Sequence, residues 1–74
     1  MSATKYQIFL KTVECGSFTK AAEELNFSQS GISHAISSLE EELGVTLFVR
    51  GKRRLTLTEE GGFLLQRAAQ LLDL

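Results

Sequence analysis

The side chains best suited to molecular recognition belong to five residues at helical spacing that are short or form hydrogen bonds. Gln29, Ser30, Ser33, His34 and Ser37 recur three and four residues apart, so on a helix they share one face. None carries a negative charge, and all can donate or accept hydrogen bonds. Such a face could approach the base edges and phosphates of a nucleic acid without repulsion. Taken alone, it is explained more simply as a solvated helix surface.

A dense basic segment follows this stretch. Residues 50–58 carry a net charge of +4, although the whole chain has a net charge of −1. The basic residues are Arg50, Lys52, Arg53 and Arg54. A local positive patch on an acidic protein can still guide a polyanion to one face, and the simpler alternative is a solvated hairpin tip. In combination with the acid-free face, the segment favours nucleic-acid binding.

Other kinds of site find little support. His34 has no second histidine or cysteine at ligand spacing and no partner placed for catalysis, so neither a metal site nor an enzyme is predicted. Cys15 cannot form an internal disulfide, and its place late in an apolar helix favours packing over a redox thiol. We expect a cytoplasmic protein without cofactors, signal peptide or membrane span.

The elements that must position these residues can be inferred from apolar spacing. The chain of 74 residues suits one small domain, 43% of its residues are hydrophobic, and it has no proline, as expected for a mainly helical fold. Three apolar stripes predict three helices before the basic segment. They are Tyr6, Phe9, Leu10 and Val13; Phe18, Ala21, Ala22 and Leu25; and Ile32, Ile36, Leu39 and Leu43.

Capping residues give the expected helix ends. Ser17 (or, less favoured, Thr19) and Ser28 are predicted N-caps, and the predicted stops are Gly16, Asn26 and Gly44, with Val45 folding back over the last turn. Only two residues separate the second stripe from Ser28. Two helices joined so tightly indicate a helix-turn-helix, although structural bundles contain such pairs too.

A hairpin and a fourth helix complete the expected fold. Residues 46–50 and 54–58 are typical of strands on either side of a basic turn, and Thr58 is placed to cap a helix that begins with acids. This helix is apolar on more than one face, which calls for a second partner beyond its own core. Its apolar residues are Phe63, Leu64, Leu65, Ala68, Ala69, Leu71, Leu72 and Leu74.

Four stretches resemble the N-terminal domain of LysR-type transcriptional regulators. They are Gly16–Leu25 (GSFTKAAEEL), Ser28–Ser33 (SQSGIS), Leu39–Phe48 (LEEELGVTLF) and Leu57–Gly61 (LTEEG). The resemblance implies a mainly α fold: a three-helix winged helix-turn-helix with a two-stranded β-hairpin wing, followed by a long linker helix that pairs in a homodimer. It also implies a small-molecule effector that acts only through a further C-terminal domain, absent from this chain.

The resemblance also implies a division of the chain and roles for its residues. Residues 1–58 would form the DNA-binding domain, with the helix-turn-helix at about 18–37 and the wing at about 46–57, and residues 59–74 would start the linker helix. The residues expected to contact double-stranded DNA, at an interrupted dyad, are Thr19, Lys20, Ser28, Gln29, Ser30, Ser33, His34, Ser37, Arg50, Lys52, Arg53 and Arg54. The expected dimerisation residues are Phe63, Leu64, Leu65, Ala68, Leu71 and Leu72.

This chain departs from the family pattern within the third helix. Ser30 replaces a usual proline, His34 a typical arginine and Ala35 a common glutamine, and residues 37 and 38 are serines where basic residues are frequent. The helix is therefore less cationic than is usual, so the wing is expected to supply more of the electrostatic attraction to DNA. Two alternatives stay open: a protein-interaction module that docks through its fourth helix, and a headpiece like that of the molybdate-responsive regulators.

Overall fold

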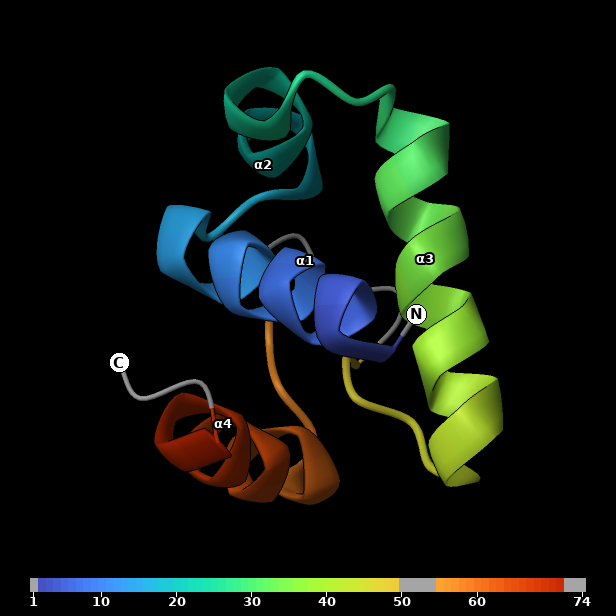
Figure 1. The fold of residues 1–74 in the computed structure, drawn as a ribbon, viewed down its shortest axis with the longest axis vertical. Coiled ribbons are helices and arrows are strands. Elements are labelled where there is room, and N and C mark those ends of the chain that lie inside the picture. The colour runs from blue at the N-terminus through green and yellow to red at the C-terminus, as the bar shows by residue number, and fades with distance from the viewer. Residues whose placement is uncertain (1, 50–54, 72–74) are drawn as a thin grey trace.

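Four helices make up the described secondary structure. The computed structural model describes residues 2–49 and 55–71. The helices are α1 (Ser2–Cys15), α2 (Phe18–Leu25), α3 (Gln29–Leu43) and α4 (Glu59–Leu71). In Figure 1, α1 crosses the middle of the molecule, with α2 above it, α3 upright on the right and α4 below. None of the described helices is both long enough and apolar enough to cross a membrane.

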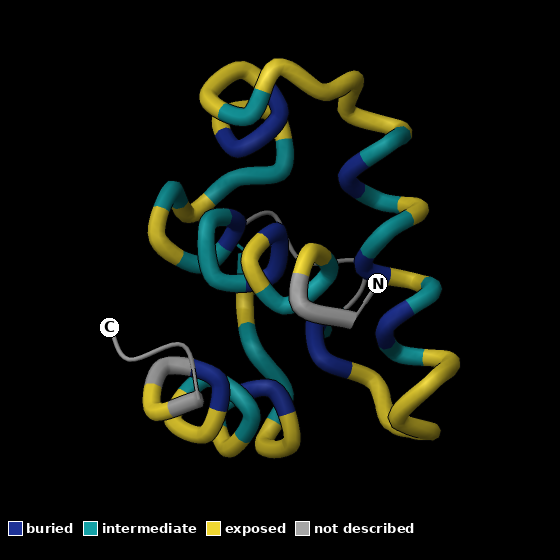
Figure 2. The backbone as a smooth tube through the Cα atoms, viewed as in Figure 1, coloured by how far each residue is buried: buried dark blue, intermediate teal, exposed yellow. Residues whose placement is uncertain are grey.

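The core lies where α1 meets the other three helices. Its largest fully buried members include Phe9 from α1, the α3 residues Ile32 and Ile36, and Phe48 from the segment after α3. The Phe48 ring packs against Phe9 at 5.6 Å between centroids and meets Phe18 edge-on at 5.5 Å. Figure 2 shows the buried residues gathered on the inward sides of the helices. This packing confirms a mainly helical domain with a single core.

The predicted helix ends are confirmed by local hydrogen bonds. Ser17 accepts from the backbone N–H of Lys20 at 3.2 Å, and Ser28 accepts from that of Gly31 at 3.0 Å. Asn26 (φ 63°) and Gly44 (φ 71°) adopt the left-handed conformation that ends α2 and α3. The N–H of Val45 then donates to the carbonyl of Glu40 at 3.2 Å, which closes α3 as expected for a Schellman-type end.

The predicted apolar stripes are correct in spacing but displaced at two places. In α1 the buried residues are Ile8, Phe9 and Thr12, whereas Tyr6 is only half-buried and packs at the edge of the core. Leu43, predicted as the last buried residue of α3, is 38% exposed because α3 ends there and the chain turns away. These differences arise from the directions in which the neighbouring elements pack against α1 and α3. The spacing of apolar residues along one helix does not reveal those directions.

The segments on either side of the basic residues lie antiparallel. Phe48 and Leu57 form an isolated antiparallel bridge, the N–H of Val49 donates to Thr56 at 2.8 Å, and that of Thr58 to Leu47 at 2.9 Å. No extended strand occurs in residues 2–49 or 55–71. The predicted turn (residues 51–53) and all four basic residues lie outside the described residues. Within the described residues, the predicted two-stranded wing is represented by one bridge and its flanking hydrogen bonds.

The fourth helix begins at the predicted position. The hydroxyl of Thr58 accepts from the N–H of Gly61 at 2.9 Å and caps α4. The backbone of Gly61 lies against Leu47, so closely that a Cβ on Gly61 would overlap the Leu47 carbonyl oxygen. The described helix has 13 residues, so the expected long linker helix is not observed at full length, and residues 72–74 lie outside the described part.

Candidate nucleic-acid interface

The candidate surface is the outer face of α3. On its inner side, Ile32, Ile36 and Leu39 are completely buried in the core. This packing fixes the rotation of the helix about its own axis, so the side chains on the opposite face must point to solvent. The Ser28 cap fixes where the helix begins. The orientation of the outer face is therefore set by apolar residues that do not belong to it.

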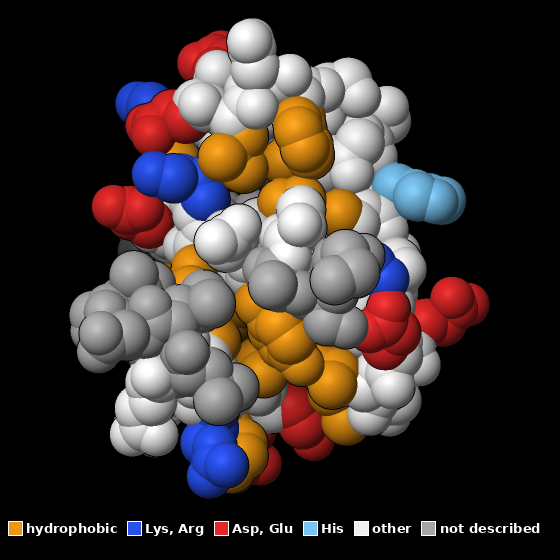
Figure 3. Space-filling model, viewed as in Figure 1, with side chains coloured by type: hydrophobic (Ala, Val, Ile, Leu, Met, Phe, Trp, Pro, Cys, Tyr) orange, Lys and Arg blue, Asp and Glu red, His pale blue; other side chains and the backbone are white. Residues whose placement is uncertain are grey.

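The structure brings all five predicted recognition residues together. They line one open hollow along the first half of α3 and comprise Gln29, Ser30, Ser33, His34 and Ser37. All are exposed except Ser33, which is half-buried. Figure 3 shows the histidine projecting from the edge of the molecule beside uncharged side chains, with acidic groups further along the same side. This arrangement offers hydrogen-bonding groups without negative charge to a ligand.

Part of the hydrogen-bonding capacity at the start of α3 is already used within the protein. The Ser28 hydroxyl caps Gly31 and also lies 3.2 Å from the Ser30 hydroxyl. Ser28 is thus mainly a structural cap that sits at the edge of the recognition face. The N-terminus of a helix carries partial positive charge, which suits a phosphate placed beside it.

Two further predicted residues lie at the start of α2. Thr19 and Lys20 are both exposed. Lys5 pairs with Glu42, and Lys11 pairs with Glu14 and Glu24, but among residues 2–49 and 55–71 no carboxylate is found within ion-pairing distance of Lys20. Lys20 is therefore the lysine whose charge is least compensated in the described part of the chain.

The predicted wing contacts, Arg50, Lys52, Arg53 and Arg54, lie outside the described residues. The segments that lead into and out of them are firmly held. Leu47 and Phe48 are completely buried on one side, and Leu55 and Leu57 pack against the core on the other. The bridge between Phe48 and Leu57 brings the two segments together. The basic residues are thus tethered at both ends to the domain that carries α3.

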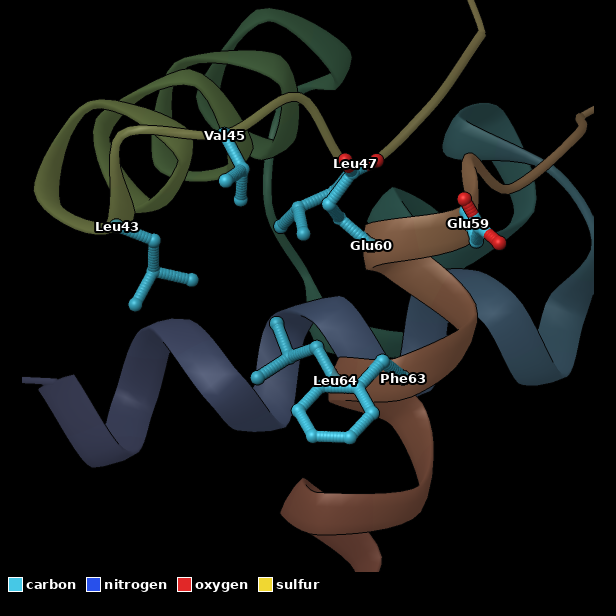
Figure 4. Close-up of a pocket in the computed structure, with 7 residues that line it drawn as sticks. All are labelled: Leu43, Val45, Leu47, Glu59, Glu60, Phe63 and Leu64. Carbon is cyan, nitrogen blue, oxygen red and sulfur yellow. The ribbon is translucent and has the colours of Figure 1, made fainter.

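The predicted dimerisation residues do not all face solvent. Ala68 is buried in this domain, Leu64 and Leu65 pack against its core, and Phe63 is 64% exposed. The side chain of Leu71 is not described, and Leu72 lies outside the described residues. Phe63 borders an apolar groove of about 480 Å³ with Leu43, Val45, Leu47 and Leu64, and Glu59 and Glu60 complete its lining. Figure 4 shows the apolar side chains of this groove on the end of α3, on the segment that follows it and on the start of α4.

One residue of this region was missed by the sequence reasoning. Glu40 is one of three consecutive acids at the end of α3, and its carboxylate turns inward and accepts from the N–H of Leu47 at 2.7 Å. The spacing of seven residues between an acid and a buried strand-like residue gives no recognisable pattern. The contact depends on the left-handed turn at Gly44, which returns the chain beside the helix.

Metal and thiol chemistry find no further support in the described residues. No group of three or more histidine, cysteine, aspartate or glutamate side chains there could hold a metal ion. Cys15 is half-buried and free. Partial burial and the nearby Glu24 carboxylate raise the pKa of its thiol, which disfavours the reactive thiolate.

Comparison with known protein families gives a specific match. The family model described as "Bacterial regulatory helix-turn-helix protein, lysR family" matches residues 4–62. The transcriptional regulator BenM of Acinetobacter baylyi is 44% identical over 73 residues, which cover 99% of this chain and 24% of BenM. The regulator CrgA of Neisseria meningitidis is 46% identical over 66 residues, covering 89% of this chain and 22% of CrgA. The chain thus spans about a quarter of the length of the curated relatives it matches.

Comparison with solved structures agrees. The BenM DNA-binding domain in complex with catB site 1 DNA superposes with a TM-score of 0.94 at 44% identity, covering 99% of this chain and 78% of that chain. DarR of Vibrio fischeri, also in complex with DNA, superposes with a TM-score of 0.92 at 27% identity, covering 99% of this chain and 25% of that chain. The arrangement of α1 to α4 is therefore that of domains solved on DNA.

Proposed function

The chain belongs to the LysR family of bacterial regulatory helix-turn-helix proteins, and from this premise we propose that it is a domain that binds double-stranded DNA in a sequence-specific manner. The observation that carries the proposal is the exposed, acid-free row of hydrogen-bonding side chains on the first half of α3. Membership of this family favours a headpiece of the LysR type over one like that of the molybdate-responsive regulators. The relatives it matches are transcriptional regulators, a role without catalysis.

Base recognition is assigned to α3. A helix with its side chains is about as wide as the major groove of B-DNA, roughly 10–12 Å, so its outer face can reach base edges. Gln29, Ser30, Ser33, His34 and Ser37 are the proposed readers, because they lie on that face and take no part in the core. Ser28, Thr19 and Lys20 are proposed to contact the backbone, which positions the helix without reading sequence.

Phosphate binding is assigned mainly to a wing formed by residues 46–57. We propose that the antiparallel segments continue into a two-stranded β-hairpin with Arg50, Lys52, Arg53 and Arg54 around its tip. The bridge between Phe48 and Leu57 supports this continuation, because it sets the two segments in hairpin order. In this assignment residues 1–58 form the DNA-binding domain and residues 59–74 the start of a longer linker helix.

A homodimer is the proposed binding species. An interrupted dyad in DNA matches a two-fold protein dimer, and α4 offers Phe63 and the groove beside it as unpaired apolar surface. Leu64, Leu65, Leu71 and Leu72 complete the proposed dimerisation face, and Leu64 and Leu65 contribute only where they reach past their own core. Ala68 is buried within its own domain and is left out of this face. A small-molecule effector would act through a further domain, and the cytoplasm is the proposed location.

Binding-site selection from random duplexes provides the test. The 74-residue chain is expected to enrich one motif, and fluorescence anisotropy should then give tighter binding to that duplex than to a scrambled one. Specific sites usually exceed non-specific ones by at least about 10³-fold for complete regulators, so a smaller but clear ratio is expected of one domain. Equal affinity for both duplexes at every salt concentration would contradict the proposal.

The apolar groove also supports a second candidate function, docking of another protein. Its wall contains Leu43, Val45 and Phe63, which are among the exposed large apolar residues of the described chain. Retention on heparin at low salt separates the two functions, because a polyanion column captures a DNA-binding face despite the acidic overall charge. A docking module without that face would pass through the column.

A further inference from the structure

Glu40 differs from the other acids at the end of α3. Glu41 and Glu42 are exposed, whereas Glu40 is half-buried and its carboxylate points back toward the first segment of the proposed wing. One oxygen, Oε2, accepts from the N–H of Leu47 at 2.7 Å and lies 3.4 Å from that of Phe48. We propose that Glu40 is a positioning residue that fixes the wing relative to the recognition face of α3. The DNA-binding consequence of this inference depends on the proposed function.

The main chain of Glu40 takes part in the same junction. Its carbonyl oxygen accepts from the N–H of Gly44 at 2.8 Å and from that of Val45 at 3.2 Å. One residue thus closes the end of α3 with its backbone and holds the following segment with its side chain. Only Thr46 lies between Val45 and Leu47, which these two attachments hold, so the chain has little freedom where it leaves α3.

Leu47, the residue held by Glu40, is also held from the far side. Its side chain is completely buried, and its carbonyl accepts from the N–H of Thr58 at 2.9 Å. The backbone of Gly61 packs against the same carbonyl. Leu47 therefore joins α3 to the outgoing wing segment and to α4. Release of its N–H would loosen one side of a junction that three elements share.

The position of Leu47 matters for the proposed DNA contacts because it is close to them along the chain. Arg50 lies three residues beyond Leu47, a reach of at most about 11 Å at roughly 3.3–3.6 Å per residue. A shift of the backbone at Leu47 is therefore passed on to the basic residues over a short path. Since α3 keeps its place in the core, such a shift changes the spacing between base contacts and phosphate contacts.

The contact itself is tested by hydrogen exchange on three variants. Glu40→Ala removes the acceptor, Glu40→Gln keeps a neutral one, and Glu41→Gln removes the same charge from an exposed site. The amide of Leu47 is expected to exchange roughly tenfold faster in Glu40→Ala than in the parent. Its exchange should be accelerated less in Glu40→Gln and should be unchanged in Glu41→Gln. Equal protection of this amide in all four proteins overturns the inference, whether or not DNA binds. If Glu40→Ala fails to fold, the comparison of the two glutamine variants decides it.

The consequence for binding is tested with the same proteins on the selected duplex. Removal of one negative charge alone strengthens binding to a polyanion, so Glu41→Gln should bind as well as the parent or better. Glu40→Gln is expected to bind more weakly than Glu41→Gln, by about threefold, with a flatter dependence of affinity on salt because the displaced wing reaches fewer phosphates. Identical affinities and salt slopes for the two glutamine variants would refute the wing-positioning role. A parent that binds no duplex refutes the proposed function instead, and the exchange experiment still tests Glu40.

Discussion

At the scale of single residues, His34 is one of the five proposed base readers. It is exposed, lines the α3 hollow and contributes nothing to the core, so its side chain can be removed without disturbing the fold. A ring nitrogen of histidine donates or accepts a hydrogen bond at a base edge, and the ring gains a charge when protonated. Neighbouring serines are shorter and reach bases only if the helix lies deep in the groove.

We predict that His34→Ala retains the stability of the parent and loses discrimination. Affinity for the selected duplex should fall by about 1–3 kcal/mol, as for one good base contact, with little change for a scrambled duplex. Fluorescence anisotropy on both duplexes gives the comparison, and thermal unfolding serves as the control for folding. Equal reductions on the two duplexes would make His34 a contact to the DNA backbone.

Cys15 is predicted to be a poor nucleophile. Partial burial and the neighbouring Glu24 raise its pKa, so less thiolate is present at neutral pH, and the thiolate is the reactive form. Alkylation by iodoacetamide at pH 7 should therefore be slower than for cysteine in a short unstructured peptide. The rate should approach that of the peptide as the pH is raised or the protein is unfolded in urea. Faster reaction in the folded protein would reinstate the thiol-switch alternative.

At the scale of elements, the start of α4 is fitted closely to the first segment of the proposed wing. Gly61 is buried, and a Cβ there would overlap the Leu47 carbonyl and approach Leu57 Cδ2 to 2.9 Å. The first obstacle is backbone of the hydrogen-bonded junction, and the second is the side chain of Leu57, which packs against the core. Gly62, the next residue along the same helix, has no atom within 4 Å of the corresponding position. The pair separates the effect of close packing from that of helix propensity.

We predict opposite effects for alanine at these two glycines. Gly61→Ala should lower the free energy of unfolding by about 1–3 kcal/mol, because the backbone of one element must move. Gly62→Ala should raise it by roughly 0.5–1 kcal/mol, the usual gain when alanine replaces glycine within a helix. Urea unfolding followed by circular dichroism measures both. Destabilisation of similar size in both variants would show that the fit against Leu47 is not the cause.

The extent to which the sequence predicts these elements follows from the range of the interactions. The caps at Ser17 and Ser28 were predictable because their hydrogen bonds reach only three residues along the chain. The burial of Thr12 in α1 was not, since it depends on which side of α1 the other helices approach. Glu40 escaped prediction for a related reason: the partner of its carboxylate is brought near only after the chain turns at Gly44.

The candidate site was predicted more completely than the fold around it. Its residues share one face of one helix, so the period of 3.6 residues is enough to group them. Their chemical role cannot be predicted from the spacing, because a merely solvated polar face and a DNA-recognition face have the same composition. The match to a family with DNA-bound members supports the second interpretation. The placement of residues 46–49 and 55–57 beside the helices depends on nonlocal packing and required the structure.

At the scale of the whole molecule, positive charge is concentrated in the basic segment, while the five proposed base readers on α3 carry no acidic group. In residues 2–49 two of the three lysines are paired with acids, so they add little to the attraction for DNA. We predict that the double variant of Arg53 and Arg54 to alanine binds all duplexes more weakly by a similar factor. The slope of log affinity against log salt should flatten by about 0.9 for each phosphate that the wing no longer neutralises. A changed sequence preference with an unchanged slope would instead make the wing a base reader.

The last prediction concerns self-association through α4. Phe63 is 64% exposed beside the apolar groove, even with Arg67 5.9 Å from the centre of its ring, so it presents a large apolar surface that its own core does not bury. Phe27, on the turn between α2 and α3, is 46% exposed and provides a matched control away from α4.

Burial of one phenylalanine contributes about 1.5–3 kcal/mol, and a two-fold dimer buries two copies. Phe63→Ser should therefore raise the dissociation constant of the dimer at least about tenfold, while Phe27→Ser leaves it unchanged. Sedimentation equilibrium across micromolar to millimolar concentrations measures both variants against the parent. A parent that stays monomeric throughout this range, with α4 folded, would contradict dimerisation by this chain; equal weakening in both variants would place the interface elsewhere.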